Sequence, residues 1–378
     1  MKEDWKECKL GDVVEINQNS FSEKENWMFV NYLDTGSITE NKISEIQYIN
    51  LIDEKLPSRA KRKVKKNSII YSTVRPNQKH FGIIKSFPEN FLVSTGFAVL
   101  DVNKKIAFPD FVYYYLIQNE NTESLHAIAE QTTSAYPAIK PSDIADIFIK
   151  LPPLATQQKI AQILSSLDDK IELNNKINDN LEQQAQAIFK SWFVDFEPFG
   201  GVMPEGWKMG KLSDLITVKY GKAHKKLEDG SYPVYGSGGI MRYVDKFLYD
   251  KESVLIPRKG TLNNVFYINE PFWSVDTMFY TEMTKENLAK FVYFFVKGKD
   301  LNSMNAGSAV PSMTTEILNA IEVVIPSDEY LEKFENIVSP MFKQIKQCII
   351  ENENLASIRD TLLPKLMNGE IGVDEVKV

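Results

Sequence analysis

The chain has 378 residues, of which 43% are apolar and 25% are charged, and its formal net charge is −7. This length allows two or three domains with cores of their own, and the composition is that of an ordinary globular protein. No apolar run approaches the roughly 18 residues that cross a bilayer, and no signal peptide opens the sequence, so we expect a cytoplasmic protein with no membrane partner. Two cysteines, Cys8 and Cys348, cannot form a disulfide framework.

Short apolar runs and helical patterns alternate in two parts of the chain. The predicted elements are strands over 67–74, 81–87 and 91–100 with a helix near 109–118, and later strands over 253–257 and 262–268 with a helix near 286–297. We therefore predict an α/β (α+β) fold, with a twisted, mostly antiparallel or mixed sheet in each globular part. The strand order does not follow from the sequence.

A 4-3 repeat of mainly apolar residues lies in the middle of the chain and predicts a helix that packs along a partner helix. Its positions are Ile160, Leu164, Leu167, Ile171, Asn174, Asn178, Leu181, Ala185, Ile188 and Trp192.

The partner helix lies in the same chain, because the sequence contains an internal repeat. Residues 5–16 match 207–218, and residues 136–152 match 310–326. The spacing of the second match continues through the helix and gives a second seam. Its positions are Phe334, Val338, Met341, Ile345, Cys348, Asn352, Leu355, Arg359, Leu362 and Leu366.

We therefore predict two copies of one unit, each a globular domain followed by a long helix. The predicted limits are 1–151 for the first domain, 152–198 for the first helix, 199–326 for a linker and the second domain, and 327–378 for the second helix and tail. The evenly spaced seams favour an antiparallel intramolecular coiled coil over two helices buried in separate cores. Pro340 is expected to kink the second helix or to begin it, with Ser339 as the cap.

In this coil Ile160 is expected opposite Leu366, Leu181 opposite Ile345, and Trp192 opposite Phe334. Asn174 would face Asn352, and Asn178 would face Cys348; a buried amide pair penalises shifted registers. About 35 helical residues span roughly 50 Å.

No catalytic, cofactor-binding or metal-binding residue is predicted. The three histidines have no metal-ligand spacing, and no Gly-x-Gly-x-x-Gly run or nucleophile elbow is present. The run "GSGG" at 236–239 could cradle a phosphate, but a glycine turn after the strand "YPVY" explains it better.

Positive charge is concentrated in both copies although the chain as a whole is acidic. Ten basic residues and no acidic one lie between Lys55 and Lys85. Solvated loops also carry such runs, and an arginine can brace its own loop, but two basic segments in two copies favour paired phosphate-binding surfaces. The candidate DNA-binding residues are Lys61, Arg62, Lys63, Arg75, Asn77 and Lys79 in the first copy and Lys222, Lys225, Arg258, Lys259 and Asn263 in the second, with Asn264 beside them.

The sequence resembles the DNA specificity (S) subunits of type I restriction-modification systems. The resemblance covers nearly the whole chain. It is carried by the repeated plan and by the segments "LPPLATQQKIAQILSSLDDKI" at 151–171, "FVDF" at 193–196 with "PEGWK" at 204–208, and "PRKGTLNNVFYINEPFWSVDTMFY" at 257–280.

This resemblance implies two target-recognition domains that each read half of a bipartite site in double-stranded DNA. It also implies that the helices dock two methyltransferase (M) subunits in a complex with restriction (R) subunits. S-adenosylmethionine would belong to the M subunits and ATP to the R subunits, so this chain would bind no cofactor and would not itself be an enzyme. Two alternatives remain: a scaffold that binds proteins, with no steep salt dependence, and a nuclease or methyltransferase, whose motifs we do not find.

Overall fold

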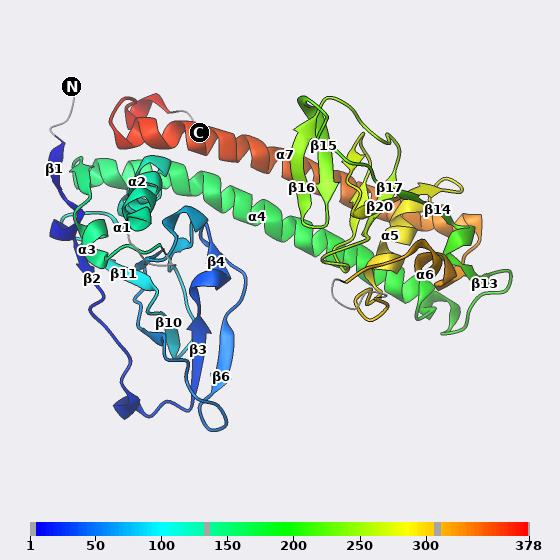
Figure 1. The fold of residues 1–378 in the computed structure, drawn as a ribbon, viewed down its shortest axis with the longest axis horizontal. Coiled ribbons are helices and arrows are strands. Elements are labelled where there is room, and N and C mark those ends of the chain that lie inside the picture. Colours follow the sequence, from blue (N-terminus) through cyan, green and yellow to red (C-terminus); the bar gives the residue numbers. More distant parts are fainter. Residues whose placement is uncertain (1–4, 132–136, 306–310, 377–378) are drawn as a thin grey trace. The chain divides into compact units, whose positions relative to one another are not determined.

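The computed structural model describes residues 5–131, 137–305 and 311–376, and it divides into two compact units (Figure 1). Unit 1 comprises Met1–Leu173 and Glu351–Val378, and unit 2 comprises Asn174–Ile350. Two helices of 40 residues, α4 (Leu154–Phe193) and α7 (Asp328–Met367), each contribute one part to each unit. The limits predicted from the sequence instead separate each long helix from the globular domains, and they stay a prediction.

Within its described residues, unit 1 contains three mainly antiparallel sheets and one short hairpin. Its strands are β1 (Lys6–Lys9), β2 (Val14–Ile16), β3 (Phe29–Leu33), β4 (Ile38–Thr39), β5 (Lys42–Ile43), β6 (Gln47–Asn50), β7 (Ala60–Arg62), β8 (Ile69–Ser72), β9 (Phe81–Ile83), β10 (Phe91–Ser94), β11 (Phe97–Val102) and β12 (Phe148–Leu151). Its shorter helices are α1 (Pro109–Leu116), α2 (Asn119–Glu130) and α3 (Pro141–Ala145). The strand orders are β1-β12, β6-β3-β10-β7, β2-β11-β8-β9 and β4-β5.

The part of unit 2 that the structure describes contains three sheets. Its strands are β13 (Lys208–Lys211), β14 (Ile216–Tyr220), β15 (Asp229–Gly236), β16 (Gly239–Val244), β17 (Ser253–Pro257), β18 (Phe266–Ile268), β19 (Trp273–Ser274), β20 (Met278–Met283) and β21 (Glu322–Ile325). Its shorter helices are α5 (Ala289–Lys297) and α6 (Thr315–Ala320). The strand orders are β13-β21, β14-β20-β17-β18 and β16-β15-β19.

The two units share one topology, which confirms the predicted repeat. The order β2-β11-β8-β9 of unit 1 corresponds to β14-β20-β17-β18 of unit 2, and β6-β3-β10 corresponds to β16-β15-β19. The parallel pairs also correspond, because β10 lies parallel to β3 and β19 lies parallel to β15. Unit 1 has in addition the β4–β5 hairpin and β7, which lie between Ile16 and Ser68 and have no counterpart among the described strands of unit 2.

Four predicted strands differ from the structure, among them the strand predicted over 67–74, of which only Ile69–Ser72 forms a strand. The single strand expected over 91–100 is two strands, β10 and β11, in different sheets, because the chain turns at Thr95 and Gly96. Of the strand predicted over 262–268 only Phe266–Ile268 is extended, and the strand predicted over 81–87 ends at Ile83. The local sequence pattern does not show where pairing begins or ends, so it overestimates the length of these strands.

The beginning of α4 and the end of α7 pack together in the core of unit 1. Ile160, Leu164 and Leu366 are at most 1% exposed and belong to one cluster with the aromatic helix α1. Asp168 near the middle of α4 contacts Arg359 of α7, so the two chain directions are opposed, as the predicted antiparallel coil requires.

The end of α4 and the beginning of α7 pack in the same way in unit 2. Phe334 and Val338 are fully buried, and the ring centroids of Trp192 and Phe334 lie 6.5 Å apart. The Trp192–Phe334 contact in unit 2 thus agrees with the predicted register, and Ile160 and Leu366 lie in one core cluster of unit 1, as that register requires. Asn174 and Asn352 fall in different units, and their pairing stays a prediction.

Pro340 does not begin α7, so that part of our expectation is wrong, and the alternative of a kink at Pro340 stays a prediction. The helix runs without a break from Asp328 to Met367. Pro340 lies on the exposed side, while Val338 and Met341 on either side of it pack in the core of unit 2. Tertiary packing therefore compensates for the backbone hydrogen bond that proline cannot donate. Ser339 is not a cap, and its hydroxyl donates to Glu335 one turn earlier.

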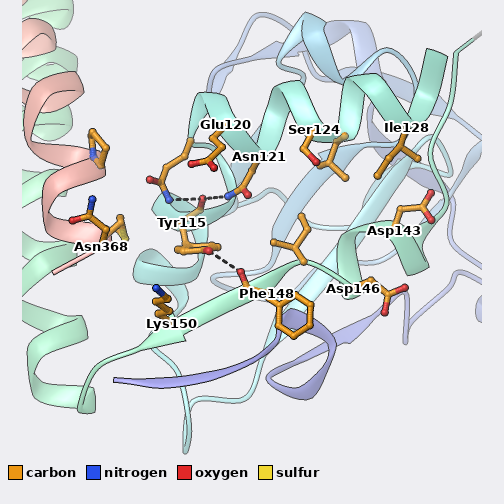
Figure 2. A pocket seen from close by; sticks show the side chains of 15 residues that line it. Tyr115, Glu120, Asn121, Ser124, Ile128, Asp143, Asp146, Phe148, Lys150 and Asn368 are labelled. Carbon is orange, nitrogen blue, oxygen red and sulfur yellow. Dashed lines mark hydrogen bonds between the residues drawn. The ribbon is translucent and has the colours of Figure 1, made fainter. Parts of the chain in front are cut away.

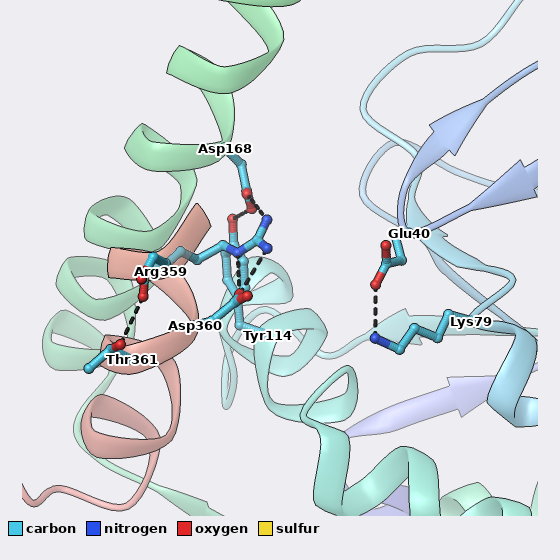
Figure 3. A network of polar contacts seen from close by, with 8 residues as sticks. Glu40, Lys79, Tyr114, Asp168, Arg359, Asp360 and Thr361 are labelled. Atoms are coloured by element: carbon cyan, nitrogen blue, oxygen red, sulfur yellow. Dashed lines mark hydrogen bonds and ion pairs between the residues drawn. The ribbon is translucent and has the colours of Figure 1, made fainter. Parts of the chain in front are cut away.

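A polar network joins the globular part of unit 1 to its helix pair (Figure 3). The carboxylate of Asp168 on α4 accepts hydrogen bonds from Tyr114 of α1 at 2.6 Å and from Arg359 of α7 at 2.7 Å. Burial, and next the charge of Asp168, raise the pKa of Tyr114 far above its ordinary value. The Tyr114 hydroxyl therefore stays protonated and acts as a donor that fixes α1 against α4.

Replacing Arg359 by alanine is expected to lower the free energy of unfolding of unit 1 by about 1–2 kcal/mol, because Asp168 keeps only its tyrosine donor. Partial solvent exposure of both side chains keeps the loss below that of a fully buried pair. The matched control is Lys170→Ala, which removes the more exposed pair with Glu351 between the same helices. Chemical denaturation should show a change of at most about 0.5 kcal/mol for this control, and equal losses for both variants would contradict the network.

Candidate nucleic-acid interface

The loop between β8 and β9 (residues 73–80) carries three of the candidate DNA-binding residues of unit 1. It is held at both sides by backbone hydrogen bonds. The amide of Thr73 donates to Gly96 at 2.8 Å, and the amide of Arg75 donates to Pro137 at 2.9 Å. This loop therefore has a fixed place at the carboxyl end of β8, where its exposed side chains Arg75 and Asn77 can meet a ligand.

Two basic residues of this loop have a left-handed backbone. Arg75 has φ +48° and Lys79 has φ +55°, and they flank a single 3-10 turn over Pro76–Gln78. For a residue with a side chain this conformation costs on the order of 1–2 kcal/mol, and such strain gathers at functional sites. Glycine would relieve it, so these positions hold basic side chains at an energetic cost.

The acid-free run between Lys55 and Lys85 is not a uniformly unpaired surface. Four of its lysines form ion pairs with carboxylates from distant segments, which the local sequence does not reveal. These pairs are Lys63–Glu25, Lys65–Asp101 at 3.0 Å, Lys79–Glu40 at 3.0 Å (Figure 3) and Lys85–Asp110. Lys63 and Lys79 thus lie beside carboxylates that the acid-free sequence segment does not contain, and their contact with DNA stays a prediction.

The other unit 1 candidates lie in different surroundings. Lys61 is exposed on β7, whereas Arg62 is half-buried and its Nε atom is buried without a hydrogen-bond partner. Burial lowers the pKa of Arg62. Lys63 lies over the ring of Trp27 with its Nζ 5.0 Å from the centroid.

The corresponding loop of unit 2 lies between β17 and β18 (residues 258–265) and is anchored at equivalent points. The amide of Arg258 donates to Thr277, as that of Thr73 does to Gly96. A β-bridge joins Lys259 to Ser312, as another joins Val74 to Ala138. Pro137 and Pro311 precede these two bridges and lie in the aligned repeat segments. The repeat could therefore have identified the bridges as a second anchor of each loop, but we did not infer it from the sequence. Tyr136 and Val310, where those segments begin, lie outside the described residues.

Two unit 2 candidates are engaged inside the protein. Arg258 donates from Nη1 to the carbonyl of Asp276 at 3.0 Å and lies over the ring of Tyr220. Asn263 donates to Asp300 at 3.3 Å and accepts from the amide of Asn302. These side chains brace the loop, which is the alternative that the sequence left open for arginine. Lys222, Lys225 and Lys259 are exposed.

An open cavity of about 590 Å³ lies in unit 1 (Figure 2). Its wall is formed by α2, α3, β12 and the end of α7. Tyr115 donates from its hydroxyl to Phe148 at 2.6 Å, and its carbonyl accepts from Gln118 and Asn121. None of the candidate DNA-binding residues lines the cavity, so it forms no part of the candidate nucleic-acid interface.

Over the residues that the structure describes, no three His, Cys, Asp or Glu side chains gather closely enough to hold a metal ion. Within the same residues, none of the helices combines the length and the apolar character that crossing a membrane requires.

The fold and the two equivalent loops define a protein with paired recognition domains on an antiparallel helix pair. Comparison with known proteins agrees with this class. The sequence matches the family model described as type I restriction modification DNA specificity domain over residues 2–183 and again over 204–359. The chain therefore belongs to the type I restriction-modification DNA specificity family.

Several relatives cover the whole chain. It is 29% identical to the specificity subunit of the type I restriction enzyme HindI from Haemophilus influenzae, over 97% of this chain and 100% of the relative. It is 25% identical to the MjaIX specificity subunit from Methanocaldococcus jannaschii, over 99% and 95%. The solved S subunit from M. genitalium shares 19% identity and a TM-score of 0.58 over 97% of this chain and 96% of that one, a likeness that concerns the fold alone.

Proposed function

We propose that this chain is the DNA-reading subunit of a type I restriction-modification complex and that it acts in the cytoplasm. Each unit reads one half of a bipartite double-stranded site, and the helix pair docks two M subunits, which join R subunits in the complete enzyme. The observation that carries this proposal is the pair of equivalent loops, 73–80 and 258–265, anchored at the same strand ends of two repeated domains.

The same proposal leaves catalysis to the partners. S-adenosylmethionine binds the M subunits and supplies the methyl group, while ATP binds the R subunits. This chain contributes exposed basic side chains that contact phosphates and loops that approach base edges, a division of labour in which phosphate contacts position and base contacts specify.

The direct test is to co-express the full chain with its M subunits and to map methylated adenines on the host DNA. The proposal expects one motif of two short defined halves separated by a spacer of unspecified sequence. Methylation at a single uninterrupted site, or none at all, would contradict it. A purely protein-binding scaffold would in addition show no steep loss of DNA affinity between low and moderate salt.

Arg75→Asn tests the strained loop, because asparagine tolerates the left-handed backbone and lacks the charge. Methylation of the cognate site is expected to fall about 10- to 100-fold, since a bidentate arginine–guanine contact is worth roughly 1–3 kcal/mol. The melting temperature should stay unchanged.

The matched control is Lys66→Asn, an exposed lysine of the same basic run that precedes β8 instead of following it. Its methylation rate should change less than about twofold, as expected for one peripheral phosphate contact at most. Equal effects of the two variants would mean that the basic run acts only through its total charge.

A further inference from the structure

The hairpin of β15 and β16 in unit 2 ends in the glycine run at 236–239. Gly236 pairs with Gly239, so Ser237 and Gly238 form a two-residue turn. Gly239 has φ +109°, which requires glycine, whereas a Cβ built on Gly238 would meet no atom within 4 Å. The glycine run is thus a turn at the end of a hairpin, as the sequence predicted. No neighbouring atom requires glycine at position 238.

Two apolar side chains follow directly after this turn on β16. Ile240 is 48% exposed and Met241 is 59% exposed. β16 is also the edge strand of the order β16-β15-β19. Exposed apolar side chains on an edge strand promote aggregation unless a partner covers them. The hairpin tip at Ile240 and Met241 is therefore a candidate binding surface.

The loop 258–265 holds the tip in place. The side-chain amide of Asn264 donates to the carbonyl of Ser237 at 2.7 Å. A Cβ on Gly260 would lie 2.9 Å from the hydroxyl oxygen of Ser237, so the backbone of Gly260 lies close to the Ser237 side chain. The side chains of Arg258, Asn263 and Asn264 are thus engaged in bracing, and Asn264 braces the hairpin tip itself.

Exposed lysines lie on the segments around the tip. Lys259 belongs to the loop that holds it. Lys222 lies beside β19, because its amide donates to Ser274 and its carbonyl accepts from the Trp273 indole at 2.9 Å, and β19 pairs with β15. An apolar tip bordered by lysines fits a polyanion that also presents apolar groups, which is the character of a DNA groove with its thymine methyls.

We propose that the tip of this hairpin, through Ile240 and Met241, enters a DNA groove and reads base pairs of the half-site assigned to unit 2. This inference rests on the proposed function and adds the residues that carry specificity. Apolar contact with base edges discriminates by shape and methyl groups, while the surrounding lysines hold the phosphates. A protein partner on the same apolar tip is the competing occupant.

The test uses the full chain with its M subunits and the double variant Ile240→Ala/Met241→Ala. Methylation at sites that differ from the cognate site in the second half is expected to rise about fivefold or more relative to cognate methylation, with the first half unchanged. The salt dependence of DNA binding should keep its slope, since no phosphate contact is lost. Lys259→Ala should instead lower that slope by about 0.9.

The control is Val202→Ala/Met209→Ala, which removes equally exposed apolar side chains elsewhere in unit 2; it should leave the motif unchanged. Gly238→Gln provides a second variant, which adds a side chain to the turn and leaves Ile240 and Met241 in place. Its side chain enters open space, so the melting temperature should hold while cognate methylation falls about tenfold or more, as steric exclusion from the DNA predicts.

An unchanged motif with unchanged methylation in both hairpin variants would overturn the inference. Weaker association with M subunits at an unchanged motif would also overturn it, in favour of a protein partner. Failure of the wild-type complex to methylate any bipartite site would contradict the proposed function and this inference with it, so the two failures are distinguishable.

Discussion

Replacing Lys290 by methionine is expected to lower the free energy of unfolding of unit 2 by about 2–4 kcal/mol. Lys290 lies on the aromatic helix α5 and is only 4% exposed. Its ammonium group contacts Glu335 of α7 at 2.6 Å and Glu252 at 3.1 Å. Removing one member of a buried ion pair leaves the other charge without compensation, and the exposure of Glu252 reduces the loss below the full buried value.

The surroundings of Lys290 increase the loss. The hydroxyls of Tyr267 and Ser339 donate to Glu252 and Glu335, so both carboxylates are held in place. The rings of Tyr267 and Phe342 lie within 5.8 Å of the ammonium group. Methionine fills the volume but supplies no charge, and Glu335, whose side chain is 17% exposed, becomes a nearly buried anion without a cation.

Chemical denaturation of the full chain measures this effect. The control is Lys333→Met, which removes an exposed pair with Glu329 one turn away on α7 and should cost at most about 0.5 kcal/mol. Adding Glu335→Leu to Lys290→Met should recover part of the loss, because the uncompensated charge is removed. A double variant less stable than Lys290→Met would contradict this account.

The sequence predicted the repeat, the mixed fold and the helix pair because each depends on periodicity over many residues. It did not predict that Lys290 and Arg359 are paired, since Glu252, Glu335 and Asp168 approach them only after folding. The same holds for the basic run of unit 1, whose carboxylate partners Glu25, Glu40, Asp101 and Asp110 lie outside it.

The same distinction between local properties and contacts made on folding applies to the candidate site. The loops after β8 and β17 could be located, because strand ends and charge are local properties. The role of each side chain could not. Asn263 and Asn264 have the chemistry of base readers, yet both bond to neighbouring loops. Only the packing of several strand ends against each other decides which side chains remain available to a ligand.

A chain that stops after Pro198 should form a homodimer with two copies of the first recognition domain. Its α4 helix offers the apolar pattern of the missing α7 segment, so a second copy can replace that segment in antiparallel pairing, with Ile160 against Trp192. With M subunits the dimer should methylate a palindrome built from the first half-site, because two-fold symmetry of the protein demands a two-fold site.

The structure shows where this dimer is weaker than the native pairing. In unit 1 the core is filled by Leu363, Leu366 and Met367 of α7, and Arg359 neutralises Asp168. In the homodimer the repeat places Phe189, Trp192 and Phe193 at the three core positions and Ala185 at the position of Arg359. Larger rings in a filled core cost roughly 1–3 kcal/mol, and Asp168 loses its cation.

Grafting the four α7 residues onto the fragment should therefore strengthen the dimer. The variant Ala185→Arg/Phe189→Leu/Trp192→Leu/Phe193→Met is expected to lower the dimer Kd at least tenfold relative to the unmodified fragment, since about 1.4 kcal/mol corresponds to one factor of ten. Analytical ultracentrifugation measures both constants. A fragment that stays a folded monomer in both forms would contradict the pairing, and methylation at a non-palindromic sequence would contradict the symmetry, because a dimer of identical domains has no means of reading two different half-sites.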